Sequence, residues 1–174
     1  MKSNKPVLSI PLSMEVAWRN YRAGSREDAA ITSLRVLQVQ PQNPDALHLL
    51  GVLAYEANDH HKAIALIGQA IRMHKTYAPM HGNLALAKLA KGDLNGAAAS
   101  ARRAFKLSPS YADAHRVLGL VYQKRGRLEE AIVEFRRARA LGLNTTDLQA
   151  HLTKALEQLS ASADPEAGVD SAEV

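Results

Sequence analysis

Seven histidines are the side chains of this chain most suited to chemistry, because imidazole binds metal ions and exchanges protons near neutral pH. His60 and His61 are adjacent, so on a helix they point in different directions and cannot chelate one ion as an i, i+4 pair would. His81 and His115 have no carboxylate or cysteine at ligand spacing. The absence of cysteine excludes disulfides, thiolate ligands and a thiol nucleophile. We therefore expect no catalytic residue, no metal site and no cofactor.

Basic residues are the second group that could bind something. The net charge is +5, and the four acids after Leu159, where there is no Lys or Arg, contribute −4, so the rest of the chain carries +9. Clusters such as Arg102-Arg103 and Arg136-Arg137 should form a convex ridge that is either solvated or in contact with an anionic partner. They are not interleaved with aromatic residues, as single-strand binders require, so we do not expect nucleic acid as a partner.

The sequence pattern that must position these residues recurs every 34 residues. The clearest column contains Ala29, Ala63, Ala97 and Ala131, and no insertion interrupts the spacing. Such a period marks a repeat protein, in which each unit buries its apolar face by stacking on its neighbours. The repeats span 10–43, 44–77, 78–111 and 112–145.

Each repeat divides into two helical stretches. In the second repeat, Asp45 to Ala57 and His60 to Met73 place apolar residues on one face at helical spacing. The break between the two helices holds a residue that tolerates a left-handed backbone, namely Gly24, Asn58, Gly92 or Gly126. Ser25, Asp59 and Asp93 follow as helix N-caps. Pro41 and Pro109 end second helices.

The ends of the chain fall outside the repeats. Residues 146–159 carry apolar side chains on one face and polar ones on the other, as a terminal capping helix requires. We expect residues 1–9 to be extended and 160–174 to form a disordered acidic tail. No stretch approaches the ~20 apolar residues that span a bilayer, and the start does not read as a signal peptide. The expectation is a cytoplasmic protein without a membrane span.

The pattern resembles the tetratricopeptide repeat. The strongest lines are 43–51 continued through Ala63 and Ala70, and 111–119 continued through Tyr122, Gly126, Ala131, Phe135 and Ala138. The resemblance covers about residues 10–145. It implies an all-α fold, a right-handed superhelix (α-solenoid) of four antiparallel helix pairs plus a C-terminal capping helix. It also implies that the first helix of each pair lines a concave groove, which holds a peptide or an amphipathic helix of a partner protein.

The expected groove residues come from columns that should face this groove. They are Trp18, Tyr21, His48, Val52, Tyr55, Asn83, Leu86, Arg116, Leu120 and Lys124. One column forms an apolar row of Trp18, Val52, Leu86 and Leu120, which either contacts a partner or packs between neighbouring first helices. The aromatic and leucine side chains would anchor the partner, while His48, Arg116 and Lys124 would orient it.

The resulting hypothesis is a non-enzymatic interaction scaffold, adaptor or chaperone that binds a protein segment. One alternative is self-assembly into homo-oligomers, with Pro6–Ile10 docked in a neighbour's groove. Another is a detached substrate-recognition module, because the second and third repeats resemble arrays attached to bacterial glycosyltransferases of the O-linked N-acetylglucosamine type. Those arrays carry an asparagine ladder in the sixth column, where this chain has only Asn83. Asn83 is also the only match to the two-carboxylate clamp of modules that bind chaperone tails.

Overall fold

The computed structural model describes residues 9–163, which form nine α-helices and no strand. The helices are α1 (Ile10–Arg22), α2 (Arg26–Val39), α3 (Pro44–Glu56), α4 (His60–Met73), α5 (Ala78–Ala90), α6 (Leu94–Leu107), α7 (Ala112–Lys124), α8 (Leu128–Ala140) and α9 (Thr146–Ala163). The expected all-α fold is confirmed.

Local sequence sets where the helices begin and end. The carboxylates of Asp59 and Asp93 accept hydrogen bonds from the backbone N–H groups of Lys62 (3.0 Å) and Gly96 (2.8 Å), so both are N-caps as expected. Ser25 occupies the same position before α2, but its side chain makes no capping hydrogen bond. The residues at the break between helices are all left-handed: φ is +87° at Gly24 and Gly92, +72° at Gly126 and +60° at Asn58.

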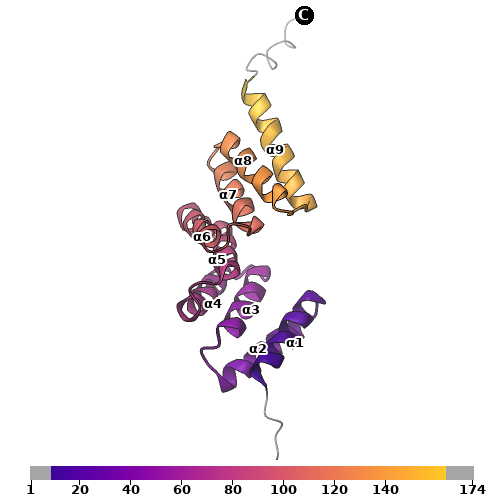
Figure 1. Cartoon of the computed structure of the whole chain (residues 1–174), viewed down its shortest axis with the longest axis vertical. Coiled ribbons are helices and arrows are strands. Elements are labelled where there is room, and N and C mark those ends of the chain that lie inside the picture. The colour runs from indigo at the N-terminus through magenta and orange to yellow at the C-terminus, as the bar shows by residue number, and fades with distance from the viewer. Residues whose placement is uncertain (1–8, 164–174) are drawn as a thin grey trace, which may run out of the picture.

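The helices form four antiparallel pairs, α1/α2, α3/α4, α5/α6 and α7/α8, and each second helix also packs on the first helix of the next pair. Because every pair repeats the same step, the pairs stack into a solenoid along the long axis of the molecule (Figure 1). Helix α9 packs against α8 and covers the end of the stack. The expected solenoid of four pairs with a capping helix is confirmed.

Small residues allow the two helices of a pair to approach closely. The repeated alanines at 29, 63, 97 and 131 are all fully buried. A Cβ on Gly51 would lie 2.5 Å from Cγ1 of Ile67, and one on Gly119 would lie 2.4 Å from Cε1 of Phe135. The large side chain of the second helix therefore rests on the bare backbone of the first.

The ends of the chain differ in part from expectation. Helix α9 continues to Ala163, so the tail expected to be disordered from Ser160 onward is helical in its first four residues. Ser9 has an extended backbone, while the rest of the expected extended segment, residues 1–8, and the remaining tail, 164–174, lie outside the described residues. In the part that is described, no helix is long and apolar enough to cross a bilayer.

Candidate partner-binding groove

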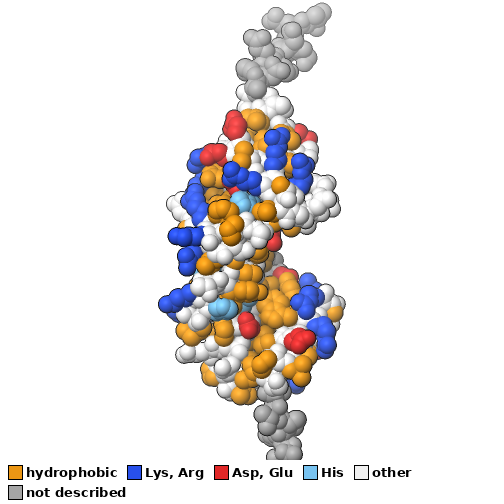
Figure 2. All heavy atoms as spheres, in the orientation of Figure 1, with side chains coloured by type: hydrophobic (Ala, Val, Ile, Leu, Met, Phe, Trp, Pro, Cys, Tyr) orange, Lys and Arg blue, Asp and Glu red, His pale blue; other side chains and the backbone are white. Residues whose placement is uncertain are grey.

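The first helices of the pairs, α1, α3, α5 and α7, contact one another in sequence, and α9 extends the row beside α7. Figure 2 shows the molecule hollowed on one side, between the part built by α7–α9 and the part built by α1–α3, with hydrophobic side chains on the wall of the hollow. Lys and Arg side chains gather on the opposite edge, where α4 and α6 lie (Figure 2). Arg102 and Arg103 of α6 are exposed, as expected for a convex ridge.

An aromatic cluster lies in the N-terminal half of this row. The indole of Trp18 on α1 lies 5.3 Å from the imidazole of His48 on α3, measured between ring centroids. Tyr77, just before α5, lies 6.1 Å from the same imidazole, again between ring centroids. Tyr21 stands edge-on to Trp18 with their centroids 5.7 Å apart. Two consecutive first helices and the residue that precedes the third therefore contribute to one aromatic surface.

His48 is the buried centre of this cluster, with 2% of its surface exposed. Its Nε2 lies 2.8 Å from the side-chain nitrogen of Asn83, and its Nδ1 is buried without a hydrogen-bond partner. Burial lowers the pKa of His48 to about 4, so the imidazole is neutral at pH 7. His48 thus lies at the groove as expected, but it is buried between helices, where it packs against Trp18 and Tyr77.

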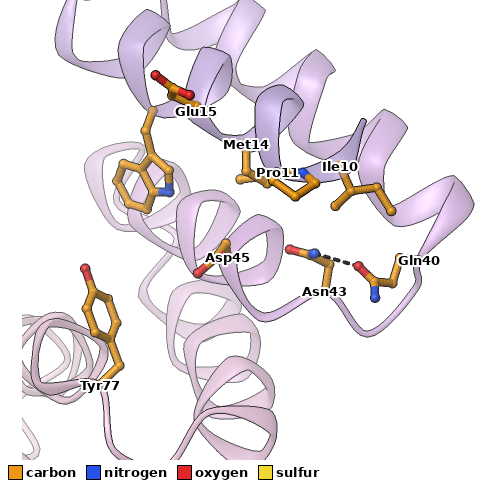
Figure 3. Close-up of a pocket in the computed structure, with 9 residues that line it drawn as sticks. Ile10, Pro11, Met14, Glu15, Gln40, Asn43, Asp45 and Tyr77 are labelled. Carbon is orange, nitrogen blue, oxygen red and sulfur yellow. Dashed lines mark hydrogen bonds between the residues drawn. The ribbon is translucent and has the colours of Figure 1, made fainter. Parts of the chain in front are cut away.

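Two open pockets adjoin the cluster. One, of about 510 Å³, is bordered by Tyr21 and Arg22 of α1, by His48, and by Pro79 and Asn83 of α5. The other, of about 620 Å³, is shown in Figure 3: Ile10, Pro11 and Met14 of α1 face Asn43 and Asp45 at the start of α3, Glu15 lies at the rim and points away from them, and Tyr77 lies across the pocket. Both pockets share Glu15, Trp18 and Tyr77 in their lining.

The lining includes side chains that the sequence analysis did not select. Tyr77 is 43% exposed, and the carboxylates of Glu15 and Asp45 are exposed and form no ion pair with any residue in 9–163. A signal for Asp45 was present, because it lies three residues before the expected groove residue His48 and so on the same face of the helix. Tyr77 falls in the linker that closes its repeat, where the helix periodicity carries no information about direction.

Beside the pockets, side-chain hydrogen bonds to one carboxylate join the first two repeats. The Tyr21 hydroxyl donates to Oε1 of Glu56 (2.6 Å), and Nε of Arg26 donates to Oε2 of the same carboxylate (3.1 Å). Burial, followed by the hydrogen bond to Glu56, raises the pKa of Tyr21 to about 12. The Tyr21 hydroxyl is thus already engaged, and its ring is the part available to a partner. Tyr55, also expected in the groove, is half-buried and lies 5.7 Å from the His60 ring.

The C-terminal half of the groove offers less exposed surface to a partner. Val52 is buried, and Leu86 and Leu120 are partly buried against the core formed by α5, α6 and α7. Of the two alternatives for the apolar row, Val52 follows internal packing, and Leu86 and Leu120 follow it in part. Much of the apolar surface of these side chains is therefore already buried in the absence of a partner.

The two expected cations of this half differ from each other. The Arg116 guanidinium lies 2.9 Å from Oδ1 of Asp113 and 3.7 Å from Oδ2 of Asp147 on α9. Lys124, by contrast, is exposed and forms no ion pair within residues 9–163. Arg116 therefore ties α7 to the capping helix, and only Lys124 remains free to contact an acidic group.

The fold and groove can be set beside solved structures. The Cut9–Hcn1 hetero-tetramer of the APC/C matches with 21% identity and a TM-score of 0.78 over 84% of this chain and 30% of that chain. A thermophilic TPR protein of Thermus thermophilus, TTC0263, matches with 23% identity and a TM-score of 0.74 over 93% of both chains. A mutant O-GlcNAc transferase of Thermobaculum terrenum matches with 30% identity and a TM-score of 0.67 over 74% of this chain and 26% of that chain.

This chain thus spans less than a third of the Cut9–Hcn1 and O-GlcNAc transferase chains that it matches. No curated protein matches. The model of the tetratricopeptide repeat matches residues 17–78 and 83–142, which is more than half of the chain. The chain therefore belongs to the tetratricopeptide repeat family, whose fold is consistent with a protein–protein interaction scaffold and whose members are generally non-catalytic adaptors.

Proposed function

We propose that the chain binds a segment of a protein partner in the N-terminal half of its concave groove, around Trp18. The observation that carries this proposal is the pair of adjoining pockets that share Trp18, Tyr77 and Glu15. Aromatic side chains lose little conformational freedom on binding and supply much of the affinity at protein interfaces. The two pockets, of about 620 and 510 Å³, are large enough to receive side chains of a partner.

The other groove residues flank this centre. Asn83 is held by His48 at the edge of the first pocket, and Leu86 and Leu120 continue the apolar wall toward α7. A partner segment that begins at Trp18 would pass these leucines and reach Lys124, which is free to meet a carboxylate. An extended peptide or an amphipathic helix fits this order of surfaces. A chaperone activity would be the case in which the bound segment is unfolded.

The proposal is tested by affinity capture followed by mass spectrometry, comparing the wild type with Trp18→Ala. A matched control is Leu34→Ala on α2, because Leu34 is 52% exposed and lies on a second helix outside both pockets. All three proteins must show the same helical circular dichroism. Partners retained by the control and lost by Trp18→Ala support the proposal, whereas partners retained equally by both variants contradict it.

A second candidate is a substrate-recognition module that acts for a separate glycosyltransferase. The observation that favours it is the 30% identity with the Thermobaculum terrenum O-GlcNAc transferase over 74% of this chain. Asn83, the one residue of the expected asparagine ladder, is engaged by His48, which weakens this candidate. Recovery of a glycosyltransferase among the captured proteins would support it. Light scattering on the same samples tests homo-oligomers, which the proposal of a separate partner does not require.

A further inference from the structure

The larger pocket is acidic within a basic chain. Glu15 and Asp45 line it, and neither carboxylate is neutralised by a cation in the described part of the chain. The rest of its lining is apolar or aromatic at Ile10, Met14 and Tyr77 among others, and carries the hydrogen-bonded amides of Gln40 and Asn43 (Figure 3). Such a surface selects an occupant with positive charges next to apolar side chains.

We infer that this pocket binds the chain's own N-terminal segment, Lys2–Leu8, which would lie as a strap beside Trp18. The inference rests on the proposed function only in treating the same groove as a binding site. It goes further in naming the occupant, and it gives the chain an internal competitor for any partner that uses Trp18.

The composition of the segment matches the pocket. Lys2 and Lys5 are its only charged side chains, and they are opposite in sign to Glu15 and Asp45. Pro6-Val7-Leu8 follow as an apolar run that contains no acid. The pocket presents the same two kinds of surface, with Ile10, Pro11 and Met14 on one wall, Asp45 on the facing wall and Glu15 at the rim.

The segment can also reach the pocket without moving α1. Ser9 is the N-cap of α1, and the next residue, Ile10, already lines the pocket. Glu15 lies six residues along the helix from Ser9, which is about 9 Å at the helical rise. The four residues from Lys5 to Ser9 span up to about 14 Å when extended, and the lysine side chain adds to this reach. The apolar run would thus fall on the near wall and Lys5 beside the acids.

Because the segment is joined to α1 by so short a tether, weak contacts are sufficient for it to occupy the pocket part of the time. A segment joined directly to its site has an effective concentration in the millimolar range, so a contact with a millimolar dissociation constant leaves the pocket about half occupied. Such a strap opens readily, and a partner that binds the same pocket more tightly displaces it. The strap would reduce the apparent affinity of that partner by the fraction of the pocket that it occupies.

The test uses the fluorescence of Trp18, which is the only tryptophan in the chain and lines the pocket. Removal of residues 2–8 should shift the Trp18 emission to longer wavelength and raise the acrylamide quenching constant about twofold, because the half-occupied pocket is emptied. The double variant Lys2→Glu/Lys5→Glu in the full chain should give the same change. Arg102→Glu/Arg103→Glu is the matched control, because it alters the net charge equally on the exposed face of α6 and should leave Trp18 unchanged.

Addition of a synthetic peptide of residues 1–8 to the shortened protein should restore the original quenching, and the peptide with both lysines replaced by glutamate should not. Equal emission and quenching in the full and shortened proteins, at equal helical circular dichroism, would overturn the inference. A quenching difference that grows with protein concentration would also overturn it, since the segment would then occupy the groove of a second copy. The capture experiment with Trp18→Ala is independent, so the strap can fail while the groove still binds a partner.

Discussion

Two equivalent positions in successive repeats explain why one half of the groove is open and the other filled. In the third repeat, Tyr111 lies over Gly82, and a Cβ on that glycine would come within 2.5 Å of the tyrosine ring. In the second repeat, the same two columns hold Tyr77 and His48. The imidazole occupies the space that Tyr111 fills one repeat later, so Tyr77 stays 43% exposed at the pocket edge.

The charge of the groove also differs between equivalent positions of two repeats, the second and the fourth. Asp113 on α7 is bound by Arg116, three residues later on the same helix face. Asp45 occupies the matching column on α3, but the residue three positions later is the neutral His48. The carboxylate of Asp45 is consequently available to an occupant. One column, occupied by His48, Gly82 and Arg116 in successive repeats, thus decides both the shape and the charge of the groove.

The largest effect should come from making the third repeat like the second. Gly82→His would place a side chain where Tyr111 packs, so the tyrosine must leave its site or the helices must separate. We expect the free energy of unfolding to fall by about 3 kcal/mol. Urea unfolding monitored by circular dichroism measures this. A variant as stable as the wild type would show that Tyr111 moves aside without cost, and the comparison would lose its basis.

The pH dependence of stability should report the burial of His48. Its pKa is about 4 in the folded chain against 6.5 when unfolded, so between these values the unfolded chain binds the extra proton. The stabilisation by neutral His48 is therefore complete above pH 6.5 and is lost as the pH falls toward 4. Between pH 7 and pH 4.5 the wild type should lose about 2–3 kcal/mol more than His48→Gln. Parallel profiles for the two proteins in urea titrations would contradict this.

The close contacts between paired helices occur in both halves of the groove, so overpacking them should cost a similar amount of stability in each half. Ala63 and Ala97 are fully buried at equivalent positions on α4 and α6. Ala63→Leu and Ala97→Leu should each lower the free energy of unfolding by about 2 kcal/mol, because the added methylene groups overpack the contact. Ala65→Leu and Ala99→Leu, at exposed positions of the same helices, are the controls for thermal melts. Clearly different costs at the two buried sites would show that the two halves differ in their core as well as in the groove.

The smallest expected effect is the difference in stability between variants of Asp113 and Asp45. Asp113→Asn removes the ion pair with Arg116, which is partly exposed, and should cost about 0.5 kcal/mol more than Asp45→Asn. Both residues lie in the first turn of their helices, so the loss of the favourable helix-dipole contact is common to both variants. The difference between their urea midpoints is the quantity to measure. Equal midpoints would mean that the Arg116 pair adds no stability.

Local rules were sufficient to predict most of the fold. The left-handed positions and the carboxylate caps depend on the backbone preferences of single residues, so Asn58, Asp59 and Asp93 could be assigned from their types and spacing. The repeated alanines are buried for a similarly simple reason, because their column has no room for a larger group. The end of α9 was harder to predict, since Ser160–Ala163 carry neither a proline nor a glycine to stop the helix.

The groove could be predicted only in part. Periodicity correctly placed Trp18, Tyr21 and Asn83 on first helices that border one pocket. It could not show that His48 and Val52 are buried, because exposure at those columns depends on how closely the neighbouring first helices approach. Nor could it show that Arg116 is held by Asp147, a residue of the capping helix.

The sequence by itself therefore determined the helices, their breaks and the 34-residue stacking, because these follow from short-range backbone preferences and from a repeated apolar pattern. The tertiary structure decided which groove positions are filled and which remain open. That outcome depends on contacts between side chains about one repeat apart, such as Tyr77 with His48 and Tyr111 with Gly82. A single substitution in one of these pairs changes the surface without changing the periodicity that builds the fold.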